Sequence, residues 1–176
     1  MSTGGTILET ERLILRQISG HDSPALAAYL SDPETMLHYP KPFEPADVDR
    51  LIARVAQTYH DYGFGLYAVL LRQSGELIGD CGFIIQEVNG QMETELGYHF
   101  ARQHWNQGFA TEAAAACRDH AFGVLKLNRL ISLIRPVNLQ SRRVAEKVGL
   151  SIESEIVKWN LPHYVYSISR QSLSSD

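Results

Sequence analysis

The feature that most constrains the fold is a strand–helix–strand unit in the middle of the chain. A strand-like run ends in "ELGYHF" at residue 100, and the stretch "HWNQGFATEAAAA" at residues 104–116 then breaks the chain and starts an alanine-rich helix. After this helix, expected over about Phe109–Leu125, the run "RLISLIRPVN" is typical of a buried strand. The unit predicts a mixed α/β domain built around one sheet.

The remaining segments add strands on both sides of this unit. "TILETERLILRQI" alternates apolar and polar residues and predicts one strand, and "LYAVLLRQSGELIGDCGFII" predicts a hairpin with its turn at Gln73–Gly75. An Asn89-Gly90 turn leads from this hairpin into the strand that ends at "ELGYHF". Further helices are expected in "HDSPALAAYL", "PADVDRLIARVAQTYHDYG" and "NLQSRRVAEKVGL", and further strands in "SIESEIVKWN" and "HYVYSISRQ". The total is about seven strands and about four helices.

Size and charge restrict the partners of this chain. Its 176 residues, 44% of them apolar, suit one domain over 1–176 with a frayed tail at about 172–176. The net charge of −4 offers no basic surplus, so we expect no nucleic-acid partner and no membrane partner. No signal-like start and no long apolar run occur, which predicts a soluble cytoplasmic protein. Cys81 and Cys117 are isolated and are interpreted as buried free thiols.

The start of the alanine-rich helix is a candidate anion site. The first backbone N–H groups of a helix have no partner within the helix and lie at the positive end of its dipole. Gly108 lets the backbone curl there, so that consecutive amides could bind a pyrophosphate. An ordinary strand-to-helix loop would have the same sequence. Neither the G-x-G-x-x-G fingerprint nor a P-loop is present at this turn.

Several segments resemble a known family. "GYHFARQHWNQGFATEA" followed by "NLQSRRVAEKVGL", together with "LETERLILRQI", "SDPETM" and "ELIGDCGF", is similar to the GCN5-related N-acetyltransferases (GNAT), in particular their RimJ/RimL-like branch. The resemblance implies a twisted sheet that opens into a V and holds acetyl-CoA. It also implies transfer of the acetyl group to a primary amine, either a protein N-terminus or a small molecule, by a monomer or homodimer.

The resemblance assigns cofactor contacts by position. The family's R/Q-x-x-G-x-G/A loop falls on residues 105–110, with Trp105 in place of the usual first residue. The pantetheine arm would pair with the strand at Tyr98 and Phe100, and Asn138 and Ser141 would contact the pantetheine or acetyl region. The implied cofactor-binding residues are Tyr98, Phe100, Trp105, Asn106, Gln107, Gly108, Phe109, Ala110, Thr111, Asn138 and Ser141.

Two catalytic roles follow from the same resemblance. The tyrosine that many members use to protonate the leaving thiolate is replaced by Ala145, and Ser141 is the expected substitute. Tyr164 and Tyr166 are fallback donors, and Ser141 could instead only stabilise its helix. Glu95 is the candidate general base, although a solvated carboxylate would look the same, and His99 and His163 are less favoured.

The acceptor is expected to contact aromatic residues of the N-terminal segments, namely Tyr39, Phe43 and Tyr62. Asp61 and Glu44 could attract a cationic amine. The histidines show no metal-ligand spacing, so no metal is expected. Two alternatives remain: a CoA-binding sensor module without turnover, and a flavin- or nucleotide-binding α/β protein that uses the same helix start.

Overall fold

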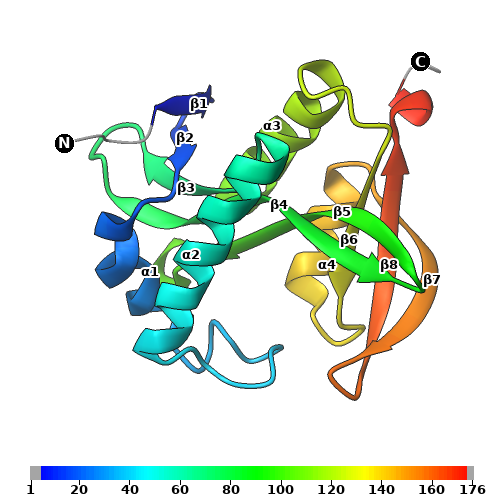
Figure 1. Cartoon of the computed structure of the whole chain (residues 1–176), viewed down its shortest axis with the longest axis horizontal. Helices are drawn as coiled ribbons and strands as arrows, with labels where there is room; N and C mark the ends of the chain where they lie inside the picture. The colour runs from blue at the N-terminus through cyan, green and yellow to red at the C-terminus, as the bar shows by residue number, and fades with distance from the viewer. Residues whose placement is uncertain (1–4, 174–176) are drawn as a thin grey trace.

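An eight-stranded mixed sheet runs through the part of the chain that the computed structural model describes, residues 5–173 (Figure 1). Its strands are β1 (Thr6–Glu9), β2 (Leu13–Gln17), β3 (Leu66–Leu71), β4 (Leu77–Val88), β5 (Gln91–Phe100), β6 (Arg129–Ile134), β7 (Ser151–Lys158) and β8 (Leu161–Ser169). The helices are α1 (Ser23–Leu30), α2 (Pro45–Tyr62), α3 (Phe109–Gly123) and α4 (Leu139–Lys147). The strand order is β1-β2-β3-β4-β5-β6-β8-β7, so the predicted mixed α/β fold with four helices is confirmed.

The prediction of one N-terminal strand is wrong, which is why the sheet has eight strands rather than seven. The chain reverses between β1 and β2, and the two strands pair antiparallel. Thr10 makes this turn, because its amide donates to the Leu13 carbonyl at 2.9 Å and its Oγ1 accepts from the Leu13 amide at 3.0 Å. A threonine side chain that bonds to nearby backbone in this way competes with a continuous ladder.

The central strand–helix–strand unit is present as predicted, and it contains the parallel neighbours β5 and β6. Their register consists of one pair, Glu95 with Ile131, whereas β4 and β5 pair along ten positions. Ser132 Oγ adds a side-chain bond of 2.7 Å to the Leu96 carbonyl at this point. The two halves of the sheet therefore meet over a short length, and the carboxyl-terminal ends of β5 and β6 are free to diverge.

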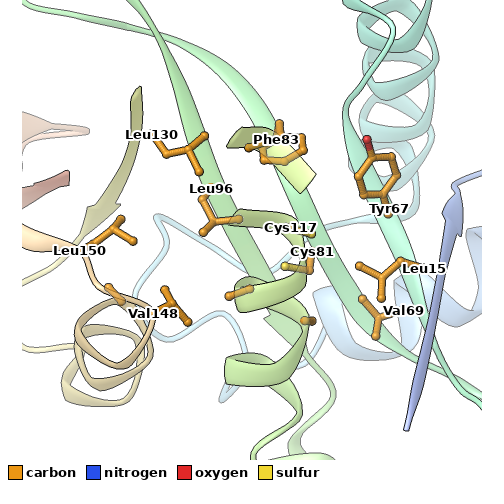
Figure 2. Close-up of a cluster of buried hydrophobic side chains, with 14 of the residues drawn as sticks. Leu15, Tyr67, Val69, Cys81, Phe83, Leu96, Cys117, Leu130, Val148 and Leu150 are labelled. Atoms are coloured by element: carbon orange, nitrogen blue, oxygen red, sulfur yellow. The ribbon is translucent and has the colours of Figure 1, made fainter. Parts of the chain in front are cut away.

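The helices cover both faces of the sheet. The small residues Ala113, Cys117 and Ala121 let α3 pack closely on one face, where α4 also lies. Figure 2 shows this core, in which side chains of β2 to β6 meet Cys117 of α3 and the chain after α4. On the opposite face α1 and α2 bury Leu26, Leu30 and other residues against β3, and Figure 1 shows α2 crossing in front. Because α3 and α2 lie on opposite faces, the diverging end of β5 has one helix on each side of the sheet.

Two further expectations concern thiols and the C-terminus. Cys81 and Cys117 are both free and buried, as predicted, and burial raises the pKa of the Cys81 thiol. Arg170–Leu173 form a short 3₁₀ turn, and residues 174–176 of the expected frayed tail lie outside the described residues. Within residues 5–173 no helix is both long and apolar enough to cross a membrane.

Candidate active site

The N-terminus of α3 presents backbone amides to the surface beyond β5. Gly108 is the N-cap residue with φ of 82°, and Asn106 also has a positive φ of 59°. The first intrahelical bond runs from the Glu112 amide to the Gly108 carbonyl at 3.0 Å. The amides between these two residues therefore have no partner within the helix, as the sequence predicted. A glycine is favoured at the N-cap because a side chain there would be strained at this φ.

A pair of residues that sequence reasoning missed holds this turn in place. Arg12, just before β2, donates from Nε to Glu112 Oε2 at 2.6 Å and from its guanidinium to the Gln107 carbonyl at 2.9 Å. The same guanidinium lies 4.4 Å from the centre of the Phe109 ring. Burial alone would raise the pKa of Glu112, but hydrogen bonds from Thr10 and Arg12 lower it below its usual value. The clamp connects the edge of the sheet to the start of α3 and fixes the direction of its amides.

A groove of about 510 Å³ begins at these amides, and we call it the α3 groove. Trp105, Asn106, Gly108, Phe109, Ala110 and Thr111 line one end. Arg143 and Lys147 on the exposed side of α4 also line it. Amides at a positive helix end with two cations nearby are suited to a phosphate-rich ligand.

The edge of β5 forms the floor between the two ends of the groove. The Ala101 amide donates to Ile78 on the β4 side, so strand alternation directs the Phe100 amide to the opposite edge, toward the opening. Trp105 Nε1 donates to the Phe100 carbonyl at 2.7 Å, which ties the loop to the strand. Tyr98 crosses to α4, where its hydroxyl donates to the Ser141 carbonyl at 2.8 Å. Trp105, absent from the usual family pattern, therefore has a structural role in this loop.

Asn138 and Ser141 lie at the start of α4, at the far end of the groove. Asn138 is the N-cap, and its Oδ1 accepts from the Ser141 amide at 3.2 Å. Both residues line the α3 groove. Ala145, which stands where many relatives have a tyrosine, is buried in the core. No proton donor can come from that position, and the Ser141 hydroxyl is the alternative on the same helix.

A second cavity of about 530 Å³ lies between α2, β5 and the β7–β8 hairpin, and we call it the α2 cavity. Tyr39 and Phe43, two of the residues expected to contact the acceptor, line it together with Glu95, the candidate base. Glu95 is buried rather than solvated, which removes the solvated alternative. Its carboxylate accepts from Gln86 Nε2 at 2.7 Å and from the Leu133 amide at 3.3 Å, and burial raises its pKa.

The α3 groove and the α2 cavity meet. Six residues line both of them, and we call this shared set the junction: His38, Tyr39, Tyr98, His99, Asn138 and Ser141. A ligand that fills the groove from the α3 amides would therefore end beside a ligand in the cavity. Two reactants brought together in this way gain the rate advantage of proximity.

A hydrogen-bond chain that the sequence did not reveal passes through the junction. Asp80 is buried, with its Oδ2 accepting from Tyr29 OH at 2.7 Å and its Oδ1 lying 2.9 Å from His99 Nδ1. His99 Nε2 lies 2.7 Å from the Tyr39 hydroxyl. Burial lowers the pKa of His99, but the Asp80 and Glu95 carboxylates together raise it by more, and the pKa is above the ordinary 6.5. The chain can hold or pass a proton at the wall shared by both cavities.

Some predicted site residues lie elsewhere. Gln107 lines neither cavity, since its carbonyl accepts from Arg12 and its side chain donates to the Gln103 carbonyl. Tyr62 also lines neither, because it sits half-exposed at the end of α2 against Phe64. Tyr164 and Tyr166 likewise line neither cavity, and the Tyr166 hydroxyl donates to Glu146 Oε1 at 2.9 Å. Tyr62 as an acceptor contact and the two fallback donors are therefore not supported.

Comparison with known proteins gives the same class of protein. The profile of the Acetyltransferase (GNAT) domain matches residues 12–151. YkkB of Bacillus subtilis is 36% identical over 162 residues, which cover 92% of this chain and 94% of YkkB. The crystal structure of an acetyltransferase from Agrobacterium tumefaciens has a TM-score of 0.82 and 29% identity, and covers 96% of each chain. RimJ of Mycobacterium smegmatis in complex with CoA-disulfide shares the fold, with a TM-score of 0.72 and 21% identity over 93% of this chain and 85% of RimJ.

The open sheet, with a helix N-terminus beyond the carboxyl end of a strand, defines a class of α/β proteins that bind ligands at this edge. Within that class the chain belongs to the GNAT acetyltransferase family, and it is an acetyl-CoA-dependent acyltransferase.

Proposed function

We propose that this chain transfers the acetyl group of acetyl-CoA to a primary amine by direct attack of the amine nitrogen on the thioester. The observation that carries the proposal is the junction, where the α3 groove and the α2 cavity share six residues. Acetyl-CoA supplies the activated acetyl group from one side and the amine enters from the other. No acylated side chain is needed, because both reactants reach the same wall.

The residues that line the α3 groove in this chain suit acetyl-CoA. The amides of Gly108 to Thr111 would bind the diphosphate, and Arg143 and Lys147 add positive charge for the phosphates. The pantetheine would lie along Tyr98–Phe100, with the Phe100 amide directed at the thioester carbonyl. Asn138 would contact the pantetheine or acetyl region, where it also fixes the first turn of α4 through Ser141.

Two proton transfers are required, and the α2 cavity and the junction each contain a group for one of them. A primary amine with pKa near 10.4 costs about 5 kcal/mol to deprotonate at pH 7, so a base beside it is useful. We assign this role to Glu95, whose raised pKa makes it a stronger base than an exposed glutamate. The Ser141 hydroxyl donates a hydrogen bond to the departing thiolate, and the thiolate takes up the second proton, which the nitrogen loses as the amide forms.

The acceptor of this transfer is an amine, either a protein N-terminus as in the RimJ/RimL-like branch or a small molecule. The decisive experiment measures thiol release from acetyl-CoA with a panel of amines and N-terminal peptides, together with the affinity for acetyl-CoA. Amine-dependent thiol release supports the proposal. Tight acetyl-CoA binding without thiol release from any amine would instead favour the sensor module.

A further inference from the structure

The α2 cavity carries positive side chains that are not in direct contact with a carboxylate. Arg54 of α2, Arg135 after β6 and Lys158 at the end of β7 all line it. Within residues 5–173 none of the three forms an ion pair with a carboxylate. Lys158 instead places its ammonium 4.5 Å from the centre of the Trp159 ring. Three cations from three separate elements thus converge on one cavity in a chain whose net charge is −4.

One nitrogen of Arg135 lacks a hydrogen-bond partner. Its Nε is buried and has no hydrogen-bond partner among the described residues. A buried donor without an acceptor is costly, so native proteins rarely leave one unless a ligand or water completes it. Arginine is also the side chain best suited to a planar carboxylate. The missing partner at this wall is therefore an acceptor oxygen.

The carboxylates of the same cavity are already engaged. Asp47 is paired with Lys41 at 3.6 Å and with Arg50, and Glu95 is bonded to Gln86 and the Leu133 amide. Glu44 and Asp61, which the sequence suggested as guides for a cationic amine, do not line the cavity. The charges available to a ligand in the cavity are thus predominantly positive.

The positive charge also affects the pKa values of two histidines that line the cavity. Burial lowers the pKa of His38, and the Arg135 charge lowers it further. Burial also lowers the pKa of His163; its bond to the Leu161 carbonyl opposes this, while Lys158 and Arg135 add to the lowering. A lowered pKa favours the neutral form of both histidines at pH 7, so neither adds to the charge of Arg54, Arg135 and Lys158. Burial also lowers the pKa of Lys158, while the Glu95 carboxylate opposes this and Arg54 adds to it.

We infer that the acceptor is an amine that also carries a carboxylate, and that Arg135 and Lys158 bind this carboxylate while the amine nitrogen lies at the junction. The inference rests on the proposed function and deepens it by naming a class of acceptor. A diamine or polyamine would place its second ammonium among three cations that form no direct ion pair and is disfavoured. A free amino acid and an N-terminal peptide with an acidic side chain share the required chemistry.

Three probes of similar length test the acceptor class: δ-aminovalerate, cadaverine and pentylamine. We expect kcat/KM for δ-aminovalerate to exceed that for cadaverine and pentylamine by about tenfold or more, the size of one charge-assisted contact. Acidic and neutral N-terminal peptides, assayed beside free amino acids, distinguish the two sources of the carboxylate. Equal or better use of cadaverine would overturn the inference.

Variants locate the contact. Arg135→Gln should reduce kcat/KM for δ-aminovalerate about tenfold while pentylamine changes less than about twofold, and Arg135→Lys should restore part of the loss. Lys126→Gln, at an exposed position outside both cavities, is the matched control and should change neither probe. Equal losses for both probes in Arg135→Gln would refute the assignment.

Calorimetry keeps this inference separate from the proposed function, because it needs no turnover. The binding of δ-aminovalerate and of cadaverine to the wild-type protein is measured with CoA present. Tighter binding of δ-aminovalerate supports the carboxylate site even when no thiol is released, because the lack of thiol release counts only against turnover. Thiol release from pentylamine or cadaverine without preferential binding of δ-aminovalerate supports the transferase and rejects the carboxylate site.

Discussion

His99 and Asp80 face each other directly across β5 and β4, and His99 Nδ1 lies 2.9 Å from Asp80 Oδ1. The pair lies equally far on either side of the Asn89-Gly90 turn, so the register of the hairpin brings the two residues together. Tyr29 and Tyr39 extend the contact on its two sides. A buried carboxylate is thereby connected to the surface where the two cavities meet.

Replacing Asp80 should change the protonation of His99. Burial opposes the imidazolium and Asp80 favours it, so Asp80→Asn leaves burial dominant and should lower the His99 pKa by about one unit or more. NMR titration of the His99 ring in wild type and in the variant measures this shift. An unchanged His99 titration would contradict the coupling.

The same pair makes stability depend on pH in a defined direction. A group whose folded pKa is raised stabilises the fold below its unfolded pKa, here near 6.5, and loses that contribution as the pH rises through the folded value. The stability difference between wild type and Asp80→Asn should therefore be largest below about pH 6.5 and shrink above the His99 pKa. Denaturant unfolding at several pH values tests this.

Substitution of Gly108 should weaken acetyl-CoA binding. Gly108→Val introduces a side chain at φ of 82° beside the amides and near Arg12, and we expect a loss of affinity of about tenfold or more. Gly63→Val is a matched control, because Gly63 has φ of 77° at the end of α2 and has open space around it. The control should lose similar stability while keeping its affinity. Unchanged binding in Gly108→Val would remove the α3 amides from the cofactor site.

Ser141→Ala should lower turnover more than binding. The hydroxyl is assigned to the leaving thiolate, so kcat should fall about tenfold while the Kd for acetyl-CoA changes less than about twofold. Ser151→Ala on exposed β7 provides the comparison. Full turnover in the Ser141 variant would reduce the residue to its backbone role in α4.

Glu95→Gln should separate catalysis from cofactor binding. Glu95 lines the α2 cavity but not the α3 groove, so we expect kcat to fall roughly 100-fold with little change in the acetyl-CoA Kd. If Glu95→Gln kept rapid turnover and His99→Gln lost it, the base would be the His99–Asp80 pair rather than Glu95. Steady-state kinetics with one amine and equilibrium binding give both quantities.

Local sequence patterns predicted the α3 turn, the hairpins and the helices, because each depends on residues close together in the chain. Arg12 and Glu112 could not be paired in this way, since a hundred residues separate them and only the folded sheet edge brings them together. Asp80 and His99 were accessible in principle, because the predicted Asn89-Gly90 turn sets their register. The Tyr39 contact depends on a loop whose path has no periodic signal, and the split of β1 from β2 depends on one threonine side chain.

The two cavities are built largely from different parts of the chain. Residues 98–111 and 138–147 supply most of the α3 groove, whereas α2, the loop before it and the β7–β8 hairpin supply much of the α2 cavity. Changes in the second group can alter the choice of acceptor without disturbing the amides of α3. Relatives with the same cofactor turn can therefore diverge in what they acetylate, and an engineered change of acceptor should begin at Arg54 and Lys158 of this group, together with Arg135 after β6.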